Sequence, residues 1–217
     1  MALRYYLLVP KDQRVDTWLF HKPDDLGKMC RLPEVLQIQC ANCGKFDERV
    51  ALHRRTTADI RVRSKVDLVC AVEGVMLASH RFRQVITENA ITGCDFSPVR
   101  GDDRYWVLHP TVLVATDLAT SGLRVVTPAE TGSVEASEFP CVVDKELRCV
   151  ACHRRFQVLG WPGLTSMTLP KDPKTIFVSD IPLEQPGWYS PLLYGSEDVV
   201  TILRGSKITG IDYTPVQ

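Results

Sequence analysis

The alternation of apolar and polar positions predicts short strands and two short amphipathic helices. An apolar run near the start, "YYLLVP" (5–10), predicts a first strand. Apolar residues recur at helical spacing after Ser79 and again after Ser196. Serine side chains accept hydrogen bonds from the first backbone N–H groups of a helix, so each serine is expected to be an N-cap. Asn89 and Gly205 suit the left-handed residue that often ends a helix. The predicted inward faces contain Phe82, Val85, Ile86, Val199, Val200, Ile202 and Leu203.

These helices lie in two segments that match without gaps. "SHRFRQVITENAITGCDFSPV" (79–99) and "SEDVVTILRGSKITGIDYTPV" (196–216) share seven identical residues, each pair 117 positions apart. Both continue through Ile-Thr-Gly into an alternating strand that contains a proline near its end. Strand patterns precede both helices, "DLVCAV" (67–72) and "TIFVSDI" (175–181). The match predicts an internal duplication, although two common helix-turn-strand units could also look alike.

Each half also contains a CxxC turn. Cys40 and Cys43 form the first, and Cys149 and Cys152 form the second, 109 positions later. A CxxC turn points two thiolates at one place, which is half of a tetrahedral zinc site. One turn from each half would complete a structural site with four protein ligands. The sequence therefore predicts an α+β fold of duplicated CxxC–strand–helix–strand halves, joined through a zinc-ribbon-like site.

Other interpretations of the cysteines stay open. A redox dithiol prefers a CxxC pair at a helix start, and neither pair is followed by a helical pattern. "CVACH" also fits the haem c attachment signature, and unrelated buried thiols are a further alternative. His153 is expected beside the metal, although it could replace a cysteine ligand. The other four cysteines are expected to be small buried hydrophobic residues: Cys30, Cys70, Cys94 and Cys141.

The offsets of the two matches differ by eight residues, which places extra chain near "PLEQPGWYS" (182–190) in a loop rich in proline and glycine. We expect one compact unit over 1–217. The first repeat would span 30–99 and the second repeat 141–217. Connecting strands and an acidic loop would occupy 100–140.

Charge suggests a docking surface. The chain has 217 residues and a formal net charge of zero, which does not favour a nucleic-acid binder. Residues 45–65 carry net charge +4 and residues 128–146 net charge −4. They are either balanced solvated faces or a charged surface for a macromolecule. Alternation in 58–68 also predicts a half-exposed strand. Candidate partner contacts are Arg54, Arg55, Arg61, Arg63, Trp188 and Tyr189.

Little in the sequence predicts catalysis or a membrane. The five histidines form no HxH or HExxH spacing, and there is no glycine-rich phosphate loop. We therefore expect no enzyme and no small-molecule substrate. The apolar run at the start is too short for a secretion signal, and no run reaches the length of a membrane span. These features predict a cytoplasmic protein.

With these residues in view, the chain resembles the myxobacterial double-CxxCG-motif family. The resemblance rests on two distant CxxC turns, the first as "CANCG", on Leu32-Pro33 before it, and on the ending "ILRGSKITGIDYTPV". Two features depart from the family: His153 replaces a glycine, and Ala41-Asn42 lack the family's proline.

Members of that family are identified as immunity proteins of swarming-inhibition toxin systems, in which a lipoprotein toxin passes between sibling cells. The resemblance implies a non-catalytic protein that neutralises a cognate toxin in interbacterial competition. The alternatives are a zinc-ribbon regulatory or nucleic-acid-binding module, which needs a continuous basic face, and an enzyme with a reactive thiol outside the zinc site.

Overall fold

The structure is a computed structural model with an α+β fold, rich in strands and with few short helices. It describes residues 4–11, 21–27, 29–46, 50, 62–71, 75–99, 101–121, 124–125, 139–146, 148–153, 158–159, 164, 167–179, 184–185, 188–189 and 192–216.

The strands of the two main sheets are β1 (Tyr5–Pro10), β4 (Leu68–Cys70), β5 (Met76–Ser79), β6 (Cys94–Pro98), β7 (Tyr105–Pro110), β8 (Leu113–Val114), β11 (Phe177–Ser179), β14 (Leu193–Ser196) and β15 (Ile211–Val216). Three two-stranded pairs are β2 (His21–Pro23) with β3 (Met29–Arg31), β9 (Arg124–Val125) with β10 (Val158–Leu159), and β12 (Glu184–Gln185) with β13 (Trp188–Tyr189). The helices are α1 (Pro33–Leu36), α3 (His80–Glu88), α4 (Leu118–Ser121) and α7 (Glu197–Gly205).

The two main sheets have related strand orders. The four-stranded sheet runs β4-β5-β7-β6, and the five-stranded sheet runs β15-β1-β14-β11-β8. Neighbouring strands are antiparallel except β11 and β8, which are parallel. In each sheet a hairpin strand leads directly into a helix, β5 into α3 and β14 into α7. The prediction of a first strand at residues 5–10 is confirmed.

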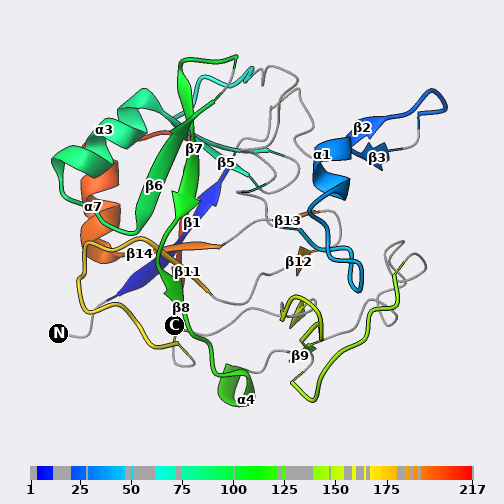
Figure 1. Ribbon diagram of the computed structural model, residues 1–217. Coiled ribbons are helices and arrows are strands. Elements are labelled where there is room, and N and C mark those ends of the chain that lie inside the picture. The colour runs from blue at the N-terminus through cyan, green and yellow to red at the C-terminus, as the bar shows by residue number, and fades with distance from the viewer. Residues whose placement is uncertain are drawn as a thin grey trace.

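The main hydrophobic core combines the two sheets with α3 and α7, which we call the long helices because each has nine residues. Leu8, Leu108 and Leu193 from the sheets pack with Phe82 of α3 and Leu203 of α7, all nearly inaccessible to solvent. Figure 1 shows α3 and α7 side by side at one side of the strands. Two further cores cover the opposite faces of the sheets, one containing Tyr105 and the other Tyr5. Both faces of β4, β5 and β11 are therefore covered, which explains why these strands are almost wholly apolar, whereas β6 and β15 keep exposed polar residues such as Asp95 and Asp212.

The predicted helix starts and faces are confirmed. The Ser79 hydroxyl accepts from the N–H of Phe82, and the Ser196 hydroxyl accepts from the N–H groups of Asp198 and Val199. The predicted inward residues are buried, apart from Ile202, which is partly buried against the same core.

The prediction that Asn89 and Gly205 are left-handed is wrong, although Asn89 is the C-cap of α3 and α7 ends at Gly205. Gly205 is still helical, Asn89 has φ −95°, and the left-handed residues are Ala90 (φ 52°) and Lys207 (φ 54°). Beyond each of them a buried isoleucine donates its N–H back to the helix, Ile91 to Ile86 and Ile208 to Leu203, both at 3.0 Å. This is the Schellman arrangement. Burial of the isoleucine outweighs the left-handed preference of asparagine and glycine.

Two other local predictions need correction. The segment 58–68 is described only from Val62, and up to β4 it forms one isolated bridge residue and no strand. Burial alternates from Val62 to Lys65, with Ser64 buried as well as Val62. Two backbone carbonyls of this segment accept from a side chain, because the Tyr105 hydroxyl donates to the carbonyls of Ser64 and Val66. The predicted loop at 182–190 contains the β12–β13 pair, with Glu184 opposite Tyr189.

The link between β6 and β7 is held by Asp102, which offers a test of pH dependence. Its buried carboxylate accepts from Arg104 Nη2 at 2.6 Å, from Arg104 Nε at 2.9 Å and from the N–H of Val62 at 3.3 Å. The Arg104 hydrogen bond lowers the pKa of Asp102 below its ordinary value of 3.8, although burial opposes this.

We expect Asp102→Asn to lower the free energy of unfolding by about 1–3 kcal/mol at pH 7. Because the folded pKa is lowered, the contribution of the carboxylate is complete above pH 3.8 and is lost as the pH falls through the lowered value. The difference between wild type and variant should therefore shrink in acid, as measured by urea titrations at several pH values. A difference that stays constant down to acid unfolding would contradict the assigned role.

Candidate metal centre

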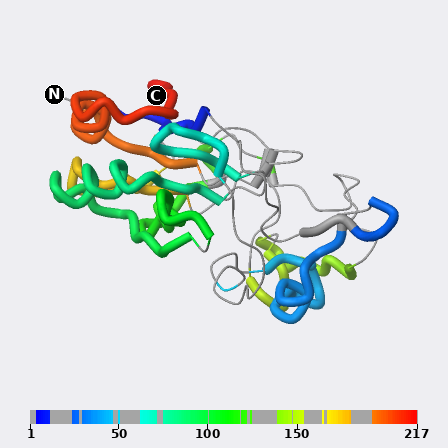
Figure 2. Tube along the Cα trace, turned by 90° about the horizontal axis from the view of Figure 1, so that it is seen from above, coloured from blue at the N-terminus to red at the C-terminus, as the bar shows by residue number. Residues whose placement is uncertain are grey.

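The two CxxC turns, which we call the first knuckle (Cys40–Cys43) and the second knuckle (Cys149–Cys152), meet in space. The Sγ atoms of all four cysteines lie within 4.8 Å of one another. Cys40 Sγ is 3.7 Å from Cys149 Sγ, and Cys43 Sγ is 3.6 Å from Cys152 Sγ. Figure 2 shows the two knuckle segments together at one end of the molecule, away from α3 and α7. Residues 109 positions apart thus form one cluster, as predicted from the sequence.

These separations suit four thiolates around one zinc ion. A disulfide would bring two sulfurs to about 2.05 Å, so these contacts are not disulfides. Tetrahedral zinc with Zn–S bonds of about 2.3 Å places its sulfur ligands about 3.8 Å apart. Four cysteines are also the donor set that selects zinc or an iron–sulfur centre over hard cations. The cluster is therefore a candidate metal site that is compatible with zinc.

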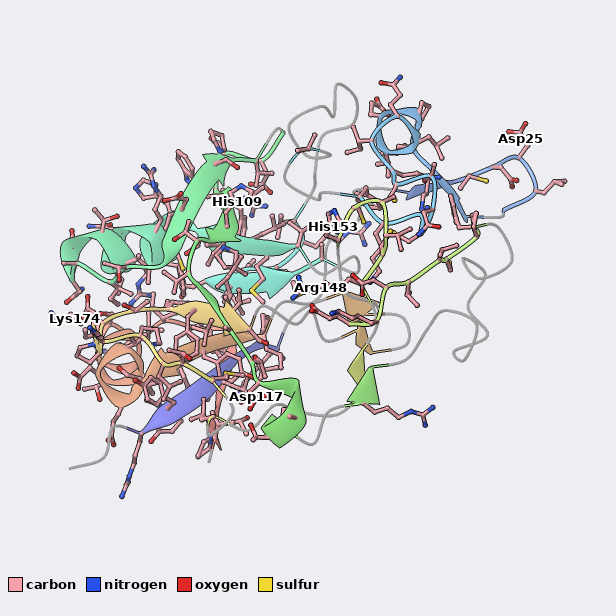
Figure 3. All side chains as sticks on the ribbon, turned by 60° about the horizontal axis from the view of Figure 1, so that its bottom comes forward. Asp25, His109, Asp117, Arg148, His153 and Lys174 are labelled. Atoms are coloured by element: carbon pink, nitrogen blue, oxygen red, sulfur yellow. The ribbon has the colours of Figure 1, made fainter. Side chains whose placement is uncertain are left out.

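The backbone of the two knuckles is the same. The N–H of Gly44 donates to the carbonyl of Cys40, and the N–H of His153 donates to the carbonyl of Cys149, each at 2.8 Å. Gly44 has φ 69° and His153 has φ 58°. His153 thus occupies the left-handed position that glycine occupies in the first knuckle, which a non-glycine residue adopts only at some cost. Figure 3 shows His153 and Arg148 on the second-knuckle segment.

Neighbouring elements hold the first knuckle in place. Arg31, at the end of β3, donates from Nη1 to the Gly44 carbonyl at 3.0 Å and to Gln39 Oε1 at 2.8 Å. Val35 of α1 is 1% exposed and packs into the core that covers one face of the four-stranded sheet. Helix α1, between β3 and the first knuckle, thus attaches the first knuckle to that sheet.

An aspartate shapes the turn before the second knuckle. Asp144 Oδ1 accepts from the N–H groups of Glu146 and Arg148 at 2.8 and 2.9 Å. The bond from the Arg148 N–H is the main reason that the pKa of Asp144 lies below its ordinary value. Val143 then forms an isolated bridge with Cys149. This turn brings the chain before the second knuckle back alongside it.

Asn42 links the two knuckles directly. Its Nδ2 donates to Cys149 Sγ at 3.1 Å and to the Val142 carbonyl at 2.8 Å, while its Oδ1 accepts from the Val142 N–H at 3.0 Å. Its backbone carbonyl accepts from the N–H of Cys141 at 2.7 Å. Asn42 therefore orients a ligand of the other half, as outer-shell residues do around metals. Spacing analysis did not single out Asn42, because its partners lie about 100 positions away.

The cluster has the electrostatics of a cation site. Burial opposes ionisation of Cys149, but hydrogen bonds from Asn42 and from the N–H groups of Cys152 and Ala151 lower its pKa to about 6. Burial raises the pKa of the Cys43 thiol, as do the thiols of Cys149 and Cys152. Cys149 therefore ionises more easily than Cys43. All four thiolates require a bound cation to compensate their charge, because like charges this close repel strongly.

Asn42→Ala tests this bridge. Removing its side chain leaves the Val142 N–H without its acceptor and takes away one of the hydrogen-bond donors to Cys149. We expect zinc affinity to fall by about 10–100-fold and the free energy of unfolding by about 1–3 kcal/mol. Competition with a colorimetric chelator measures the first and urea denaturation the second. Ala41→Gly, on the exposed neighbouring residue, is the control. It should change the zinc affinity by no more than about twofold. An unchanged zinc affinity in Asn42→Ala would contradict the bridging role.

The other predicted site residues are placed only in part. Arg63 is exposed, whereas Arg54, Arg55 and Arg61 lie outside the described residues. Trp188 and Tyr189 form β13, and their side chains lie outside the described part of the chain. His153 is not among the residues whose ligand atoms form the cluster.

The remaining cysteines differ in burial. Cys70 is buried, as predicted, and Cys94 packs partly buried against the main core, where burial raises the pKa of its thiol to about 12. Cys141 is partly buried against the metal cluster. Cys30 is only half-buried, and its Sγ lies 3.8 Å from Asp24 Oδ2. The prediction of buried thiols is therefore confirmed in full for Cys70 alone, because Cys30, Cys94 and Cys141 are all partly exposed.

Comparisons with known proteins add no family. Neither the known protein families, nor the curated proteins, nor the solved structures give a significant match to this chain. Among the helices that the structure describes, none is long and apolar enough to cross a membrane.

Proposed function

We propose that this chain is a non-catalytic immunity protein of the cytoplasm that binds and neutralises a cognate bacterial toxin. In this proposal, one structural zinc ion held by Cys40, Cys43, Cys149 and Cys152 joins two duplicated halves. The observation that carries the metal part is the convergence of the two knuckles on one point. The toxin part is supported by the resemblance of the two CxxC turns to the double-CxxCG-motif family.

The geometry of the cluster favours a structural role for the metal. Four cysteine ligands fill a tetrahedral shell and leave no position for a substrate or an activated water. Cys43 and Cys149 are 2% and 0% exposed, so a metal ion bound to them would be shielded from solvent on that side. The site would then support a binding surface, as expected for a protein that acts by complementarity and charge steering.

The metal part is tested by measuring zinc in protein purified without added metal. We expect one zinc per chain by elemental analysis, and reversible loss of that zinc on treatment with a thiol-reactive mercurial. A zinc content near zero, with iron or a disulfide in its place, would contradict the proposal.

The toxin part is tested by growth rescue. The neighbouring upstream reading frame is expressed in a test bacterium with and without this chain. We expect the frame to arrest growth alone and co-expression to restore growth, and the two purified products to form a complex. A harmless neighbour, or toxicity that this chain leaves unchanged, would remove the immunity assignment and favour a zinc-ribbon regulatory module. The zinc measurement is independent of this result.

A further inference from the structure

Strands β1 and β7 carry nearly the same sequence. "RYYLLVP" spans 4–10 and "RYWVLHP" spans 104–110, with arginine, tyrosine, leucine and proline at the same four positions. Their six strand residues also have the same order of burial: buried, half-buried, two buried, then two half-buried. The two strands thus offer the same faces to their surroundings, although one begins the chain and the other lies near its middle.

The two strands also occupy the same place in their sheets. Each is a central strand, β1 between β14 and β15 and β7 between β5 and β6. Tyr5 lies opposite Ser196 and Tyr105 opposite Ser79, the two helix N-caps. On the other side, the strand leucines lie opposite equivalent aromatic residues, Leu8 opposite Tyr213 and Leu108 opposite Phe96. The register is therefore identical in both sheets.

Hydrogen bonds just outside the strands repeat as well. The backbone carbonyl of the residue before each strand accepts from the N–H of the first residue of α7 or α3. The N–H of the residue after each strand donates to the glycine carbonyl of an Ile-Thr-Gly turn. These four bonds are Glu197 N–H to Arg4 O at 2.8 Å, His80 N–H to Arg104 O at 3.1 Å, Lys11 N–H to Gly210 O at 2.9 Å and Thr111 N–H to Gly93 O at 2.9 Å.

Each of these strands, however, lies in the sheet of the opposite half. β1 precedes the first knuckle but pairs with β14 and β15, which follow the second knuckle. β7 precedes the second knuckle but pairs with β5 and β6, which follow the first. We propose that the chain consists of two equivalent units, 4–99 and 104–216, which have exchanged their first strands. Each unit supplies the central strand of the other unit's sheet.

Further contacts between the units follow the same exchange. A Cβ added to Gly93 would lie 1.8 Å from the Ile176 carbonyl of the other unit, and one added to Gly210 would lie 2.7 Å from the Leu68 carbonyl. In the metal cluster, equivalent cysteines face each other, Cys40 with Cys149 and Cys43 with Cys152. The metal centre thus lies where the two units meet, but the exchanged strands join the units independently of any metal.

The exchange can be tested by cutting the chain between its two units. A protease site inserted between residues 100 and 101 of the full chain is cleaved in the folded protein. Gel filtration should then show both pieces eluting together, before and after zinc is removed with a chelator. They should separate only in denaturant, which also shows that cleavage is complete. Pieces that separate on removal of zinc alone would overturn the exchange, because zinc would then be the main connection.

The equivalence of the two strands is tested by interchanging their sequences. One variant carries six substitutions: Tyr6→Trp, Leu7→Val, Val9→His, Trp106→Tyr, Val107→Leu and His109→Val. The matched control is Tyr6→Leu with Leu7→Tyr, which keeps the composition of β1 but exchanges a residue facing the main core with one facing the core that contains Tyr5. We expect the interchanged chain to unfold in one transition with the zinc content of wild type, and the control to lose that transition. An interchanged chain as damaged as the control would overturn the equivalence.

Discussion

Replacing Cys149 with serine is expected to abolish zinc binding and to lower the free energy of unfolding by about 3 kcal/mol or more. Cys149 is 0% exposed, and its Sγ lies 3.7 Å from Cys40 Sγ of the first knuckle. A serine hydroxyl does not ionise near neutral pH and is a poor zinc ligand, so the remaining three thiolates hold the metal weakly. The metal link between the two knuckles, whose cysteines are 109 positions apart, is then lost, and the Asn42 bonds to Cys141 and Val142 remain to join the two segments.

The loss should be uneven along the chain. The metal cluster is separate from the main core of the sheets and long helices. Hydrogen exchange should therefore accelerate most in residues 31–46 and 139–153, and least in β1 and β7. Elemental analysis gives the zinc content, and hydrogen exchange by mass spectrometry gives the distribution.

Two cysteines outside the cluster provide the controls. Cys30→Ser, at a half-buried thiol in β3, should leave the zinc content at the wild-type value. Cys141→Ser is the more stringent comparison, because Cys141 packs against the cluster without belonging to it. A Cys149→Ser variant that keeps its zinc, or a Cys141→Ser variant that loses it, would contradict the ligand set.

The cluster of four cysteines could be predicted because its evidence is local and repeated. CxxC spacing fixes two thiolates within one turn, and the similarity of the two halves indicated that the turns could share one ion. The helices could be predicted for the same reason, since Ser79 and Ser196 precede a helical pattern of apolar residues. These features depend on a few neighbouring residues, whose conformational preferences the fold did not override.

The exchange of β1 and β7 could not be predicted from local pattern, because pattern does not determine which sheet a strand joins. The likeness of "RYYLLVP" to "RYWVLHP" is visible in the sequence, and it would have extended the predicted repeats beyond 30–99 and 141–217. The bridge through Asn42 depends on where the chain returns about 100 positions later. The left-handed positions after the two helices were missed because the burial of Ile91 and Ile208 decided them.

Substituting alanine for Gly93 is expected to lower the free energy of unfolding by about 3–5 kcal/mol. Gly93 has φ 89°, which alanine adopts only with strain. Its Cβ would also lie 1.8 Å from the Ile176 carbonyl, so one backbone must move. That movement would break the bond from the Ile176 N–H to the Thr92 carbonyl, now 2.9 Å. The segment before β6 would lose its junction with the segment before β11.

Gly205→Ala is the matched control, because it is the same substitution in a different setting. Gly205 is the last residue of α7, and a Cβ there would meet nothing within 4 Å. Alanine should therefore stabilise the protein by about 0.5–1 kcal/mol, by reducing the freedom of the unfolded chain. Urea titrations of both variants measure the two changes, and they should have opposite signs. If Gly93→Ala lies within 1 kcal/mol of wild type, the close approach of the two halves at that turn does not exist in solution.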